Sequence, residues 1–320
     1  MSDLADARSR WLSEESKYDK LQKRVVAIIK TQTRFQGIVP LLISGRAKGM
    51  PNLLKKILKK GYSYNRITDK AGARIVVRFR HEVEPALKLV ESSFDILSKE
   101  DKFDTLGHDK VGYSGVHYDV RLREAESEEA DVRGLQCEIQ VHTLCQSLWA
   151  EMSHEMSYKP AQPLPEDLLR QIYLLNAQLE IADRSFDAIS KETMQLPGAF
   201  AMGLLRSLER HFYRFTGESF DSELSLQVLD SVLMAYDPAD QKRVSFIIED
   251  FVESNWTKLQ SVFTEYENIV DRPLLLFQPE SLVLFERLES NPHMLEEVWV
   301  QRYPREELER LGIAWSKPLD

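Results

Sequence analysis

The sequence predicts an α/β domain followed by an all-helical part, and two contrasting patterns support this division. Before about residue 195, short runs rich in Val, Ile and Thr alternate with stretches of apolar residues at helical spacing. Such alternation is typical of a sheet flanked by helices. After Pro197 only helical periodicity occurs. We therefore expect two domains, over residues 1–194 and 195–320.

The elements of the first domain are predicted in order from these patterns. Pro51 suits the first turn of a helix and Gly61 suits its end, which together define a short basic helix. Residues 4–36 are expected to form one long helix, or two helices with a break. The elements expected after it are a loop over 43–52, a helix over 53–60, a strand through 67–77, a helix over 82–97, irregular chain over 101–111, a turn at 112–115, a strand over 116–122, a loop over 124–133, a strand over 135–142, and helices over 144–158 and about 166–191.

The second domain is predicted to consist of helices separated by Gly and Pro. Its many aromatic side chains are interpreted as a helical core rather than as a ligand cage. The expected helices cover residues 198–215, 222–236, 239–269, 279–290 and 292–312.

Charge is distributed unevenly along the chain. The formal net charge is −9, but residues 1–160 carry +4 and residues 161–320 carry −13. Residues 23–80 contain 15 basic residues and a single acid, Asp69. A block of one sign favours a polyanionic ligand over a solvated helix surface.

Other features narrow the class of protein. The longest apolar runs are too short for a membrane span, and the first twenty residues lack the apolar core of a secretory signal. The two cysteines, Cys137 and Cys145, fit free thiols in a reducing cytosol better than a disulfide. We expect a cytoplasmic protein without membrane contact.

Two carboxylates are predicted to lie on neighbouring strands. Asp69 precedes the Ile75–Val77 run, and Glu138 lies in the strand 135–142. A carboxylate inside a sheet is costly unless a cation compensates it. Such a pair could share Mg²⁺, which takes oxygen ligands and keeps waters and phosphate oxygens as the others. For Asp69 the structural alternative is the capping of a turn.

Four short motifs occur in order between residues 43 and 159. They are Ile-Ser-Gly-Arg-Ala-Lys at 43–48, Asp69 with Gly72 and Arg74, Gly-Tyr-x-x-x-His at 112–117, and Glu-Ile-Gln-Val-His-Thr at 138–143 followed by Trp149, His154 and Tyr158-Lys159. Together they resemble the synthetase domain of the RelA/SpoT family, and the last is most similar to small alarmone synthetases. The resemblance implies a nucleotidyltransferase-like mixed sheet flanked by helices. It also implies transfer of pyrophosphate from ATP to a nucleotide 3′-hydroxyl.

The resemblance assigns the donor side of the site to five residues. Arg46 would lie against the adenine of ATP, which suits a planar guanidinium. Lys48 and Lys56 would hold its phosphates, and each has the alternative of a solvated surface charge. Asn52 stands where the family usually has Ser and keeps a hydrogen-bonding side chain. Arg74 would face the phosphates or pair with a carboxylate.

The catalytic and acceptor residues follow from the same resemblance. Asp69 would hold Mg²⁺, and Glu138 would be a metal ligand, the general base for the acceptor hydroxyl, or both. Tyr113 would stack on the acceptor base. The other acceptor-side residues are Lys110, Gln140 and His154, and for His154 a core role is equally expected.

The acceptor side departs from the family pattern. Lys110 lies one position late, Val111 replaces an Asn, Ser114 stands where a basic residue is common, and His142 replaces an Arg. The donor side is therefore better supported than the identity of the acceptor. The hydrolase domain that precedes the synthetase in long family members is not expected, because about forty residues come before the match.

Three functions remain open. The first is an alarmone synthetase that makes ppGpp or pppGpp from ATP and a guanine nucleotide, GDP or GTP. The second is the family's toxin branch, which pyrophosphorylates the tRNA 3′ end or makes another alarmone. The third is a non-catalytic nucleotide-binding scaffold. We also expect a homo-oligomer, and a helical domain that either limits access to the acceptor site or is purely structural.

Overall fold

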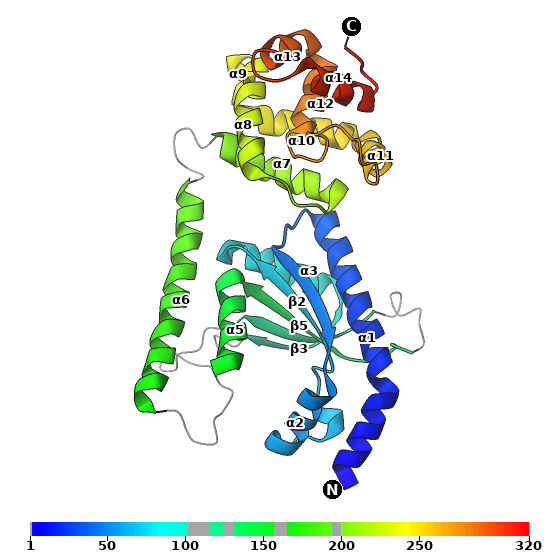
Figure 1. Ribbon diagram of the computed structural model, residues 1–320, viewed down its shortest axis with the longest axis vertical. Coiled ribbons are helices and arrows are strands. Elements are labelled where there is room, and N and C mark those ends of the chain that lie inside the picture. Colours follow the sequence, from blue (N-terminus) through cyan, green and yellow to red (C-terminus); the bar gives the residue numbers. More distant parts are fainter. Residues whose placement is uncertain (1, 102–114, 124–130, 157–164, 194–199, 320) are drawn as a thin grey trace. The chain divides into compact units, whose positions relative to one another are not determined.

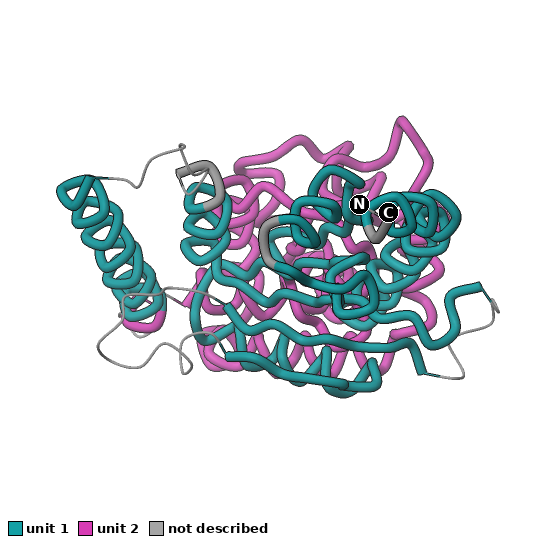
Figure 2. The backbone as a smooth tube through the Cα atoms, turned by 90° about the horizontal axis from the view of Figure 1, so that it is seen from below, with its two compact units in different colours: residues 1–33, 40–190 teal, residues 34–39, 191–320 magenta. Residues whose placement is uncertain are grey.

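The computed structural model describes residues 2–101, 115–123, 131–156, 165–193 and 200–319 (Figure 1). The chain divides into two compact units, which Figure 2 shows in different colours. Unit 1 consists of residues 1–33 and 40–190, and unit 2 of residues 34–39 and 191–320. Residues 34–39 therefore cluster with the helical part of the chain, although the sequence placed them within the first domain.

Unit 1 is built on a mixed five-stranded sheet. Its strand order is β1-β2-β5-β4-β3, in which β2 and β5 run parallel and the other neighbours are antiparallel. This architecture, with helices against the sheet, confirms the predicted fold class. The strands are β1 (Leu42–Ala47), β2 (Ala71–Val77), β3 (Asp95–Asp101), β4 (Val116–Arg121) and β5 (Cys137–Thr143).

Both edge strands differ from the sequence predictions. The predicted loop over 43–52 begins instead with β1, because this mostly exposed edge strand lacks the alternation of apolar residues that signals a strand. Gly45 within it is required, since a Cβ would lie 2.5 Å from Gln22 Oε1. The predicted helix over 82–97 ends at Ser93, and its last residues belong to β3 at the opposite edge.

The two faces of the sheet have different characters. Ile75, Tyr118 and Ile139 belong to a buried apolar face, where the Tyr118 hydroxyl donates to Glu91 of α3 (Val83–Ser93) at 2.8 Å. The close approach of Gln22 to Gly45 places α1 (Ser2–Gln36) on this same face. Alternate residues of β2, β4 and β5 form a polar face, and α5 (Leu144–Met156) contacts β5 and β2.

The short basic helix α2 (Met50–Lys60) has the predicted signals at both ends. Proline occupies its first turn, and Gly61 closes it in the left-handed conformation (φ 65°). The Gly61 N–H donates to the Ile57 carbonyl at 3.1 Å. The first turn contains no acidic residue, so the positive charge of the helix is not offset there.

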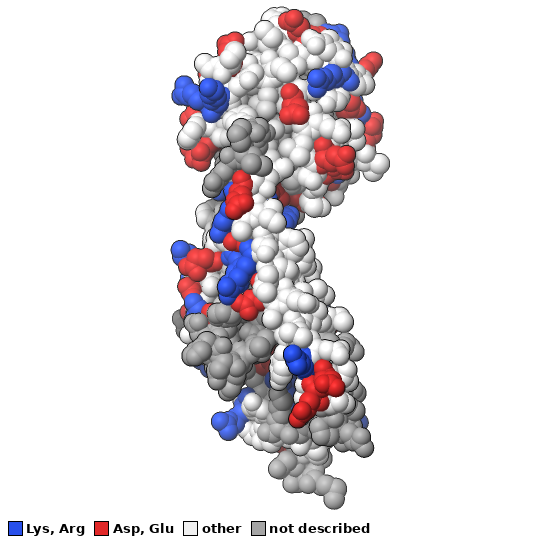
Figure 3. Space-filling model, turned by 90° about the vertical axis from the view of Figure 1, so that its left-hand side faces the viewer, with Lys and Arg blue, Asp and Glu red and all other residues white. Residues whose placement is uncertain are grey.

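Helix α6 (Glu166–Thr193) has an unusual distribution of side chains. Its buried residues are polar, namely Asn176, Asp183, Asp187 and Ser190. Asp183 accepts from the Thr143 hydroxyl at 3.1 Å, and Asp187 accepts from the His81 backbone N–H at 2.9 Å. Seven large apolar side chains of this helix are 43–64% exposed: Leu168, Tyr173, Leu174, Leu175, Ile181, Phe186 and Ile189. Figure 3 shows a broad uncharged surface along α6.

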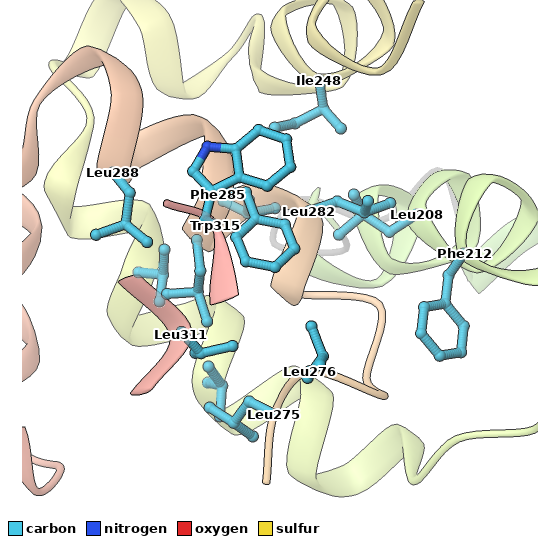
Figure 4. Close-up of a cluster of buried hydrophobic side chains, with 14 of the residues drawn as sticks. Leu208, Phe212, Ile248, Leu275, Leu276, Leu282, Phe285, Leu288, Leu311 and Trp315 are labelled. Carbon is cyan, nitrogen blue, oxygen red and sulfur yellow. The ribbon is translucent and has the colours of Figure 1, made fainter. Parts of the chain in front are cut away.

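Unit 2 is a helical assembly around an aromatic core, as predicted. Phe285 stacks on Trp315 with ring centroids 4.6 Å apart, and both side chains are fully buried (Figure 4). The helices are α7 (Phe200–Thr216), α8 (Ser222–Val232), α9 (Pro238–Gln241), α10 (Val244–Ser254), α11 (Trp256–Tyr266), α12 (Ser281–Ser290), α13 (Pro292–Trp299) and α14 (Arg305–Ala314).

Two of the predicted long helices are divided in the structure. The predicted helix over 239–269 is broken at Arg243 and Asn255 into α9, α10 and α11. The predicted helix over 292–312 is divided into α13, which ends at Trp299, and α14, which begins at Arg305 after the capping residue Pro304. A continuous apolar periodicity therefore did not reveal the breaks. No helix in the described part of the chain combines the length and apolar character that a membrane crossing requires.

Candidate active site

Asp69 is held by two lysines from different elements. Lys48, which follows β1, places its Nζ 2.7 Å from Asp69 Oδ2, and Lys56 of α2 places its Nζ 2.8 Å from the same oxygen. The Lys48 backbone N–H donates to the Lys70 carbonyl at 2.8 Å, which extends the β1–β2 pairing to the Asp69 turn. The strand edge and the helix thus converge on one carboxylate.

The electrostatics of Asp69 favour its charged form. Burial opposes ionisation of this carboxyl, but the hydrogen bonds from Lys48 and Lys56 outweigh burial and lower its pKa. Oδ1 of Asp69 is buried and has no hydrogen-bond partner. One oxygen is therefore saturated by ammonium groups, while the other is left for a ligand.

The turn that carries Asp69 is anchored by the residue after it. Lys70 is 6% exposed, and its Nζ lies 4.0 Å from the ring centroid of Tyr64 and 3.4 Å from the Tyr18 hydroxyl oxygen. The Tyr64 hydroxyl donates to Glu14 of α1 at 2.7 Å. Burial lowers the pKa of Lys70, the Glu14 charge opposes this shift, and the Arg10 charge adds to it. This network fixes the turn against α1.

Glu138 lies on the polar face of β5. Its Oε2 accepts from Gln140 Nε2 at 2.5 Å, and its Oε1 lies 3.6 Å from His117 Nδ1 of β4. Burial opposes ionisation of Glu138, and the nearby Asp69 charge does so too, but His117 and Gln140 hold its pKa below the usual value. The two predicted catalytic carboxylates are therefore close enough to repel each other.

The remaining donor-side residues occupy β1, β2 and α2. Arg74 pairs in register with Gln140, and its Nη1 lies 3.7 Å from Glu151 Oε2 of α5. Arg46 pairs in register with Gly72, and its side chain is exposed. Asn52 is exposed in the first turn of α2. The structure thus brings Lys48, Lys56 and Asp69 into contact, and Arg74 and Gln140 onto the same face as Glu138.

The structure describes only some of the residues predicted for the acceptor side. Lys110 and Tyr113 lie outside the described residues. His154 lies in α5, and its side chain is outside the description. Of the four predicted acceptor-side residues, the side chain of Gln140 is therefore the one that the structure describes, and it donates a hydrogen bond to Glu138.

Sequence reasoning gave no role to two residues of the polar face. His117 stacks on the buried His142, with ring centroids 5.6 Å apart, and approaches Glu138. Asp119 is the register partner of Glu138 on β4. The period of two along the strand 116–122 would have placed both side chains on the Glu138 face, although the strand order was needed to bring β4 beside β5.

The two carboxylates suit a hard divalent cation. Within the described ranges, no group of three or more His, Cys, Asp or Glu side chains is arranged to hold a metal ion. Asp69 Oδ1 is nevertheless buried without a partner, and Glu138 repels Asp69. Mg²⁺ needs only one or two protein carboxylates when waters and substrate phosphates complete its shell. The residues present therefore fit this ion.

Comparison with known proteins finds relatives for the part of the chain that contains this site. Residues 45–163 match the family model described as "Region found in RelA / SpoT proteins", a range that includes every predicted site residue. The GTP pyrophosphokinase YjbM of Bacillus subtilis (strain 168) is 24% identical over 162 residues, which cover 50% of this chain and 76% of YjbM. The GTP pyrophosphokinase YwaC of the same organism is 22% identical over 203 residues, which cover 60% of this chain and 96% of YwaC.

A solved structure shows the same fold. The small alarmone synthetase 1 from Bacillus subtilis aligns with a TM-score of 0.50 at 18% identity, over 59% of this chain and 100% of that chain. The mixed five-stranded sheet flanked by helices is therefore a fold that this chain shares with a small alarmone synthetase. Residues 45–163 are thus similar to the RelA/SpoT region, as the motifs predicted, and the chain adds a helical unit beyond them.

Proposed function

We propose that this protein transfers the β,γ-pyrophosphoryl group of ATP to the 3′-hydroxyl of GDP or GTP. The observation that carries the proposal is the meeting of Lys48 and Lys56 on Asp69 beside a second carboxylate, Glu138. Transfer of phosphoryl groups depends on positioning and charge neutralisation more than on covalent chemistry of the protein. The names of YjbM and YwaC as GTP pyrophosphokinases support the choice of donor and acceptor.

The lysine pair serves the donor. Each ammonium group has three N–H donors, and the bond to Asp69 uses one of them. The others are available to the β- and γ-phosphates of ATP, with Arg74 on the same side of the sheet. Arg46, exposed at the edge strand, would lie against the adenine.

Glu138 serves the acceptor as general base. The acceptor 3′-oxygen attacks the β-phosphorus, the bond from that phosphorus to the α,β-bridging oxygen breaks, and AMP leaves with the electron pair. The hydroxyl proton passes to Glu138, whose carboxylate is held by Gln140 and kept ionised by His117. Mg²⁺, when bound between Asp69 and Glu138, would supply charge neutralisation for the phosphates.

An assay with radiolabelled ATP tests the proposal. The purified protein is incubated with Mg²⁺ and β,γ-labelled ATP, and is offered GDP, GTP, AMP or deacylated tRNA in separate reactions. Label in a guanosine 3′-diphosphate product, with stoichiometric AMP, is the expected result. Absence of transfer to every acceptor would support the non-catalytic scaffold instead.

A transferase acting on the tRNA 3′ end is the second candidate. The feature that favours it is α2, which carries the exposed Lys55 and lacks an acid in its first turn. A row of cations beyond the ATP phosphates would bind a nucleic acid backbone with strong salt dependence. Label on tRNA, lost as salt rises from 50 to 200 mM, would select this function, whereas label on GDP would exclude it as the main activity.

We further propose that α6 pairs with α6 of a second copy in a homo-oligomer. Its exposed apolar residues, such as Ile181 and Phe186, lack cover within unit 1. Glu166 and Asp167 lie in its first turn and Lys191 in its last, so an antiparallel pair brings opposite charges together at both ends. Such a two-fold contact is isologous.

Light scattering tests this assembly. Ile181→Glu should lower the mass in solution toward that of one chain, and Leu12→Glu, at an exposed apolar position of α1, should leave it unchanged. An unchanged mass for Ile181→Glu would reject the pairing. So would a wild-type protein that is monomeric at all concentrations.

A further inference from the structure

The polar face of the sheet is sorted by charge across its strands. Arg46 of β1, Gly72 of β2, Glu138 of β5 and Asp119 of β4 form one row, because each is the pairing partner of the next. Arg74 belongs to the neighbouring row. In the two rows at Glu138 the basic side chains Arg46 and Arg74 therefore belong to β1 and β2, and the carboxylates belong to β5 and β4. The basic residue of β4, Arg121, lies farther along that strand, at its end.

Asp119 is an unfavourable residue for its place in the sheet. Asp is depleted in strands, and like charges directly opposite each other in an antiparallel pair destabilise it. Tyr118 and Val120, its neighbours in β4, are fully buried on the other face, so the core does not require Asp119. Its Oδ2 accepts from Ser98 Oγ at 2.9 Å, which holds the carboxylate in position. Binding of a ligand to Asp119 would explain why a carboxylate that destabilises the sheet occupies this position.

The chemistry of that ligand follows from the charge pattern. A carboxylate accepts hydrogen bonds from hydroxyl, amino and imino groups, and it repels phosphate. Phosphates are attracted to the β1–β2 side of Glu138, where Lys48, Lys56 and Arg74 lie. The group bound over β4 beside the reacting hydroxyl must therefore be uncharged and rich in donors.

We infer that Asp119 is a specificity-determining residue that accepts a hydrogen bond from the nucleoside of the acceptor. The inference rests on the proposed transfer to a guanine nucleotide and names the part of that substrate which β4 recognises. Two groups of such a nucleoside fit the chemistry, the ribose 2′-hydroxyl and the N–H donors of guanine. Both are absent from a phosphate backbone.

The test compares Asp119→Asn with the wild type in steady-state transfer. The KM for GDP should rise roughly 10–100-fold, which is the affinity that a hydrogen bond to a charged group supplies. The KM for ATP should stay within twofold, because the donor lies on the other side of Glu138. Asp95→Asn is the matched control, since Asp95 is an exposed carboxylate of the adjacent β3, and it should change neither value.

Acceptor analogues identify the group that Asp119 contacts. Inosine diphosphate lacks the guanine amino group, and 2′-deoxy-GDP lacks the ribose hydroxyl. The analogue that lacks the contacted donor should be a poor substrate for the wild type, and Asp119→Asn should lose this discrimination. The inference is overturned if Asp119→Asn keeps the wild-type KM for GDP, or raises the KM values for GDP and ATP equally.

Failure of the proposed function gives a different result. A wild-type protein without any transfer to GDP or GTP counts against the proposed function alone. In that case calorimetric titration of GDP into the wild type and Asp119→Asn decides the role of Asp119. Weaker binding to the variant supports the inference, and equal binding, or none to either protein, rejects it.

Discussion

The ammonium nitrogen of Lys48 lies 2.7 Å from Oδ2 of Asp69, whereas Oδ1 of that carboxylate is buried without a hydrogen-bond partner. One oxygen of this carboxylate therefore contacts an ammonium group, whereas the other accepts no hydrogen bond. Buried polar atoms without partners are rare in folded proteins and call for an explanation. A cation shared with Glu138 is the explanation that connects this atom to the proposed reaction.

Removing either carboxylate should stop transfer while the fold survives. Asp69→Asn and Glu138→Gln each keep the shape of the side chain but remove its charge, so each should lower kcat by at least ~100-fold, the lower scale for a catalytic acid–base group. Radiolabel transfer measures the rate, and circular dichroism verifies the fold. Glu84→Gln, at an exposed position of α3, is the control. Near wild-type turnover in a folded Asp69 or Glu138 variant would refute the site assignment.

The lysine pair should also contribute to stability. Lys48→Met leaves the partly buried Asp69 with one fewer charged hydrogen bond, so the free energy of unfolding should fall by about 1–3 kcal/mol at pH 7. Because the pKa of Asp69 is lowered in the folded state, this contribution is present above the carboxyl's unfolded pKa and is lost as pH falls through the lower, folded value.

A double-mutant cycle isolates the pair. Asp69→Asn should lower the free energy of unfolding less in the Lys48→Met background than in the wild type. In that background the substitution removes a carboxylate charge that has lost one of its two lysine partners. Lys88→Met, at an exposed position of α3, should change the free energy of unfolding by less than about 0.5 kcal/mol. Strict additivity of the two changes would show that the Lys48–Asp69 contact carries no stabilising energy.

Tyr113 is predicted to bind the acceptor base by stacking. Tyr113→Ala should weaken use of the acceptor by about 1–3 kcal/mol, the range for a base stacked on an aromatic ring. The apparent affinity for ATP should change little. Separate titrations of ATP and GDP distinguish this role from a structural one, for which both affinities would weaken together.

The sequence was most informative where a motif and a buried strand coincide. β2 and β5 were predicted because Ile75–Val77 is an apolar, β-branched run and the β-branched Ile139 and Val141 alternate with polar residues. The resemblance assigned Lys48, Lys56 and Asp69 to one site, and the structure shows that both ammonium groups contact the Asp69 carboxylate. The edge strands β1 and β3 were missed because exposed strands lack the apolar alternation that a buried face imposes.

Other parts of the site depend on tertiary arrangement. Nothing local distinguishes Asp119 from an ordinary surface acid until β4 is known to lie beside β5. The sequence predicted a helix over about 166–191, but only the structure shows that its buried face carries Asp183 and Asp187 while Ile181 is exposed. Helical periodicity identifies an amphipathic helix but does not decide which face a neighbouring element covers.

Gly115 should tolerate no side chain. A Cβ at this position would lie 2.1 Å from His142 Cδ2 and 2.2 Å from the Val141 carbonyl oxygen. Gly115→Ala must therefore displace the start of β4 and lower the free energy of unfolding by about 1–3 kcal/mol, as overpacking does. Gly203→Ala is the control, because no atom lies within 4 Å of its Cβ in α7, and it should stabilise by about 0.5–1 kcal/mol. Chemical denaturation of both variants decides, and a Gly115→Ala protein as stable as the wild type would contradict this packing.

Glu280 should make the stability of unit 2 depend on pH. Its side chain is fully buried, and neither carboxylate oxygen has a hydrogen-bond partner. Burial raises the pKa of this carboxyl from 4.5 to about 7. The folded state therefore binds a proton that the unfolded state releases between these two values. The contribution of this group to stability is highest below pH 4.5 and declines as pH rises to about 7.

Glu280→Gln should remove this decline, because the amide keeps the shape of the carboxyl without its charge. At pH 8 the variant should be more stable than the wild type by up to about 3 kcal/mol, the equivalent of the pKa difference, and at pH 4 the two should differ little. Thermal unfolding across pH 4–8 measures the difference, with Glu218→Gln at an exposed position of unit 2 controlling for the loss of one negative charge. A gap between the Glu280→Gln and wild-type curves that stays constant from pH 4 to pH 8 would mean that Glu280 does not titrate within the folded unit.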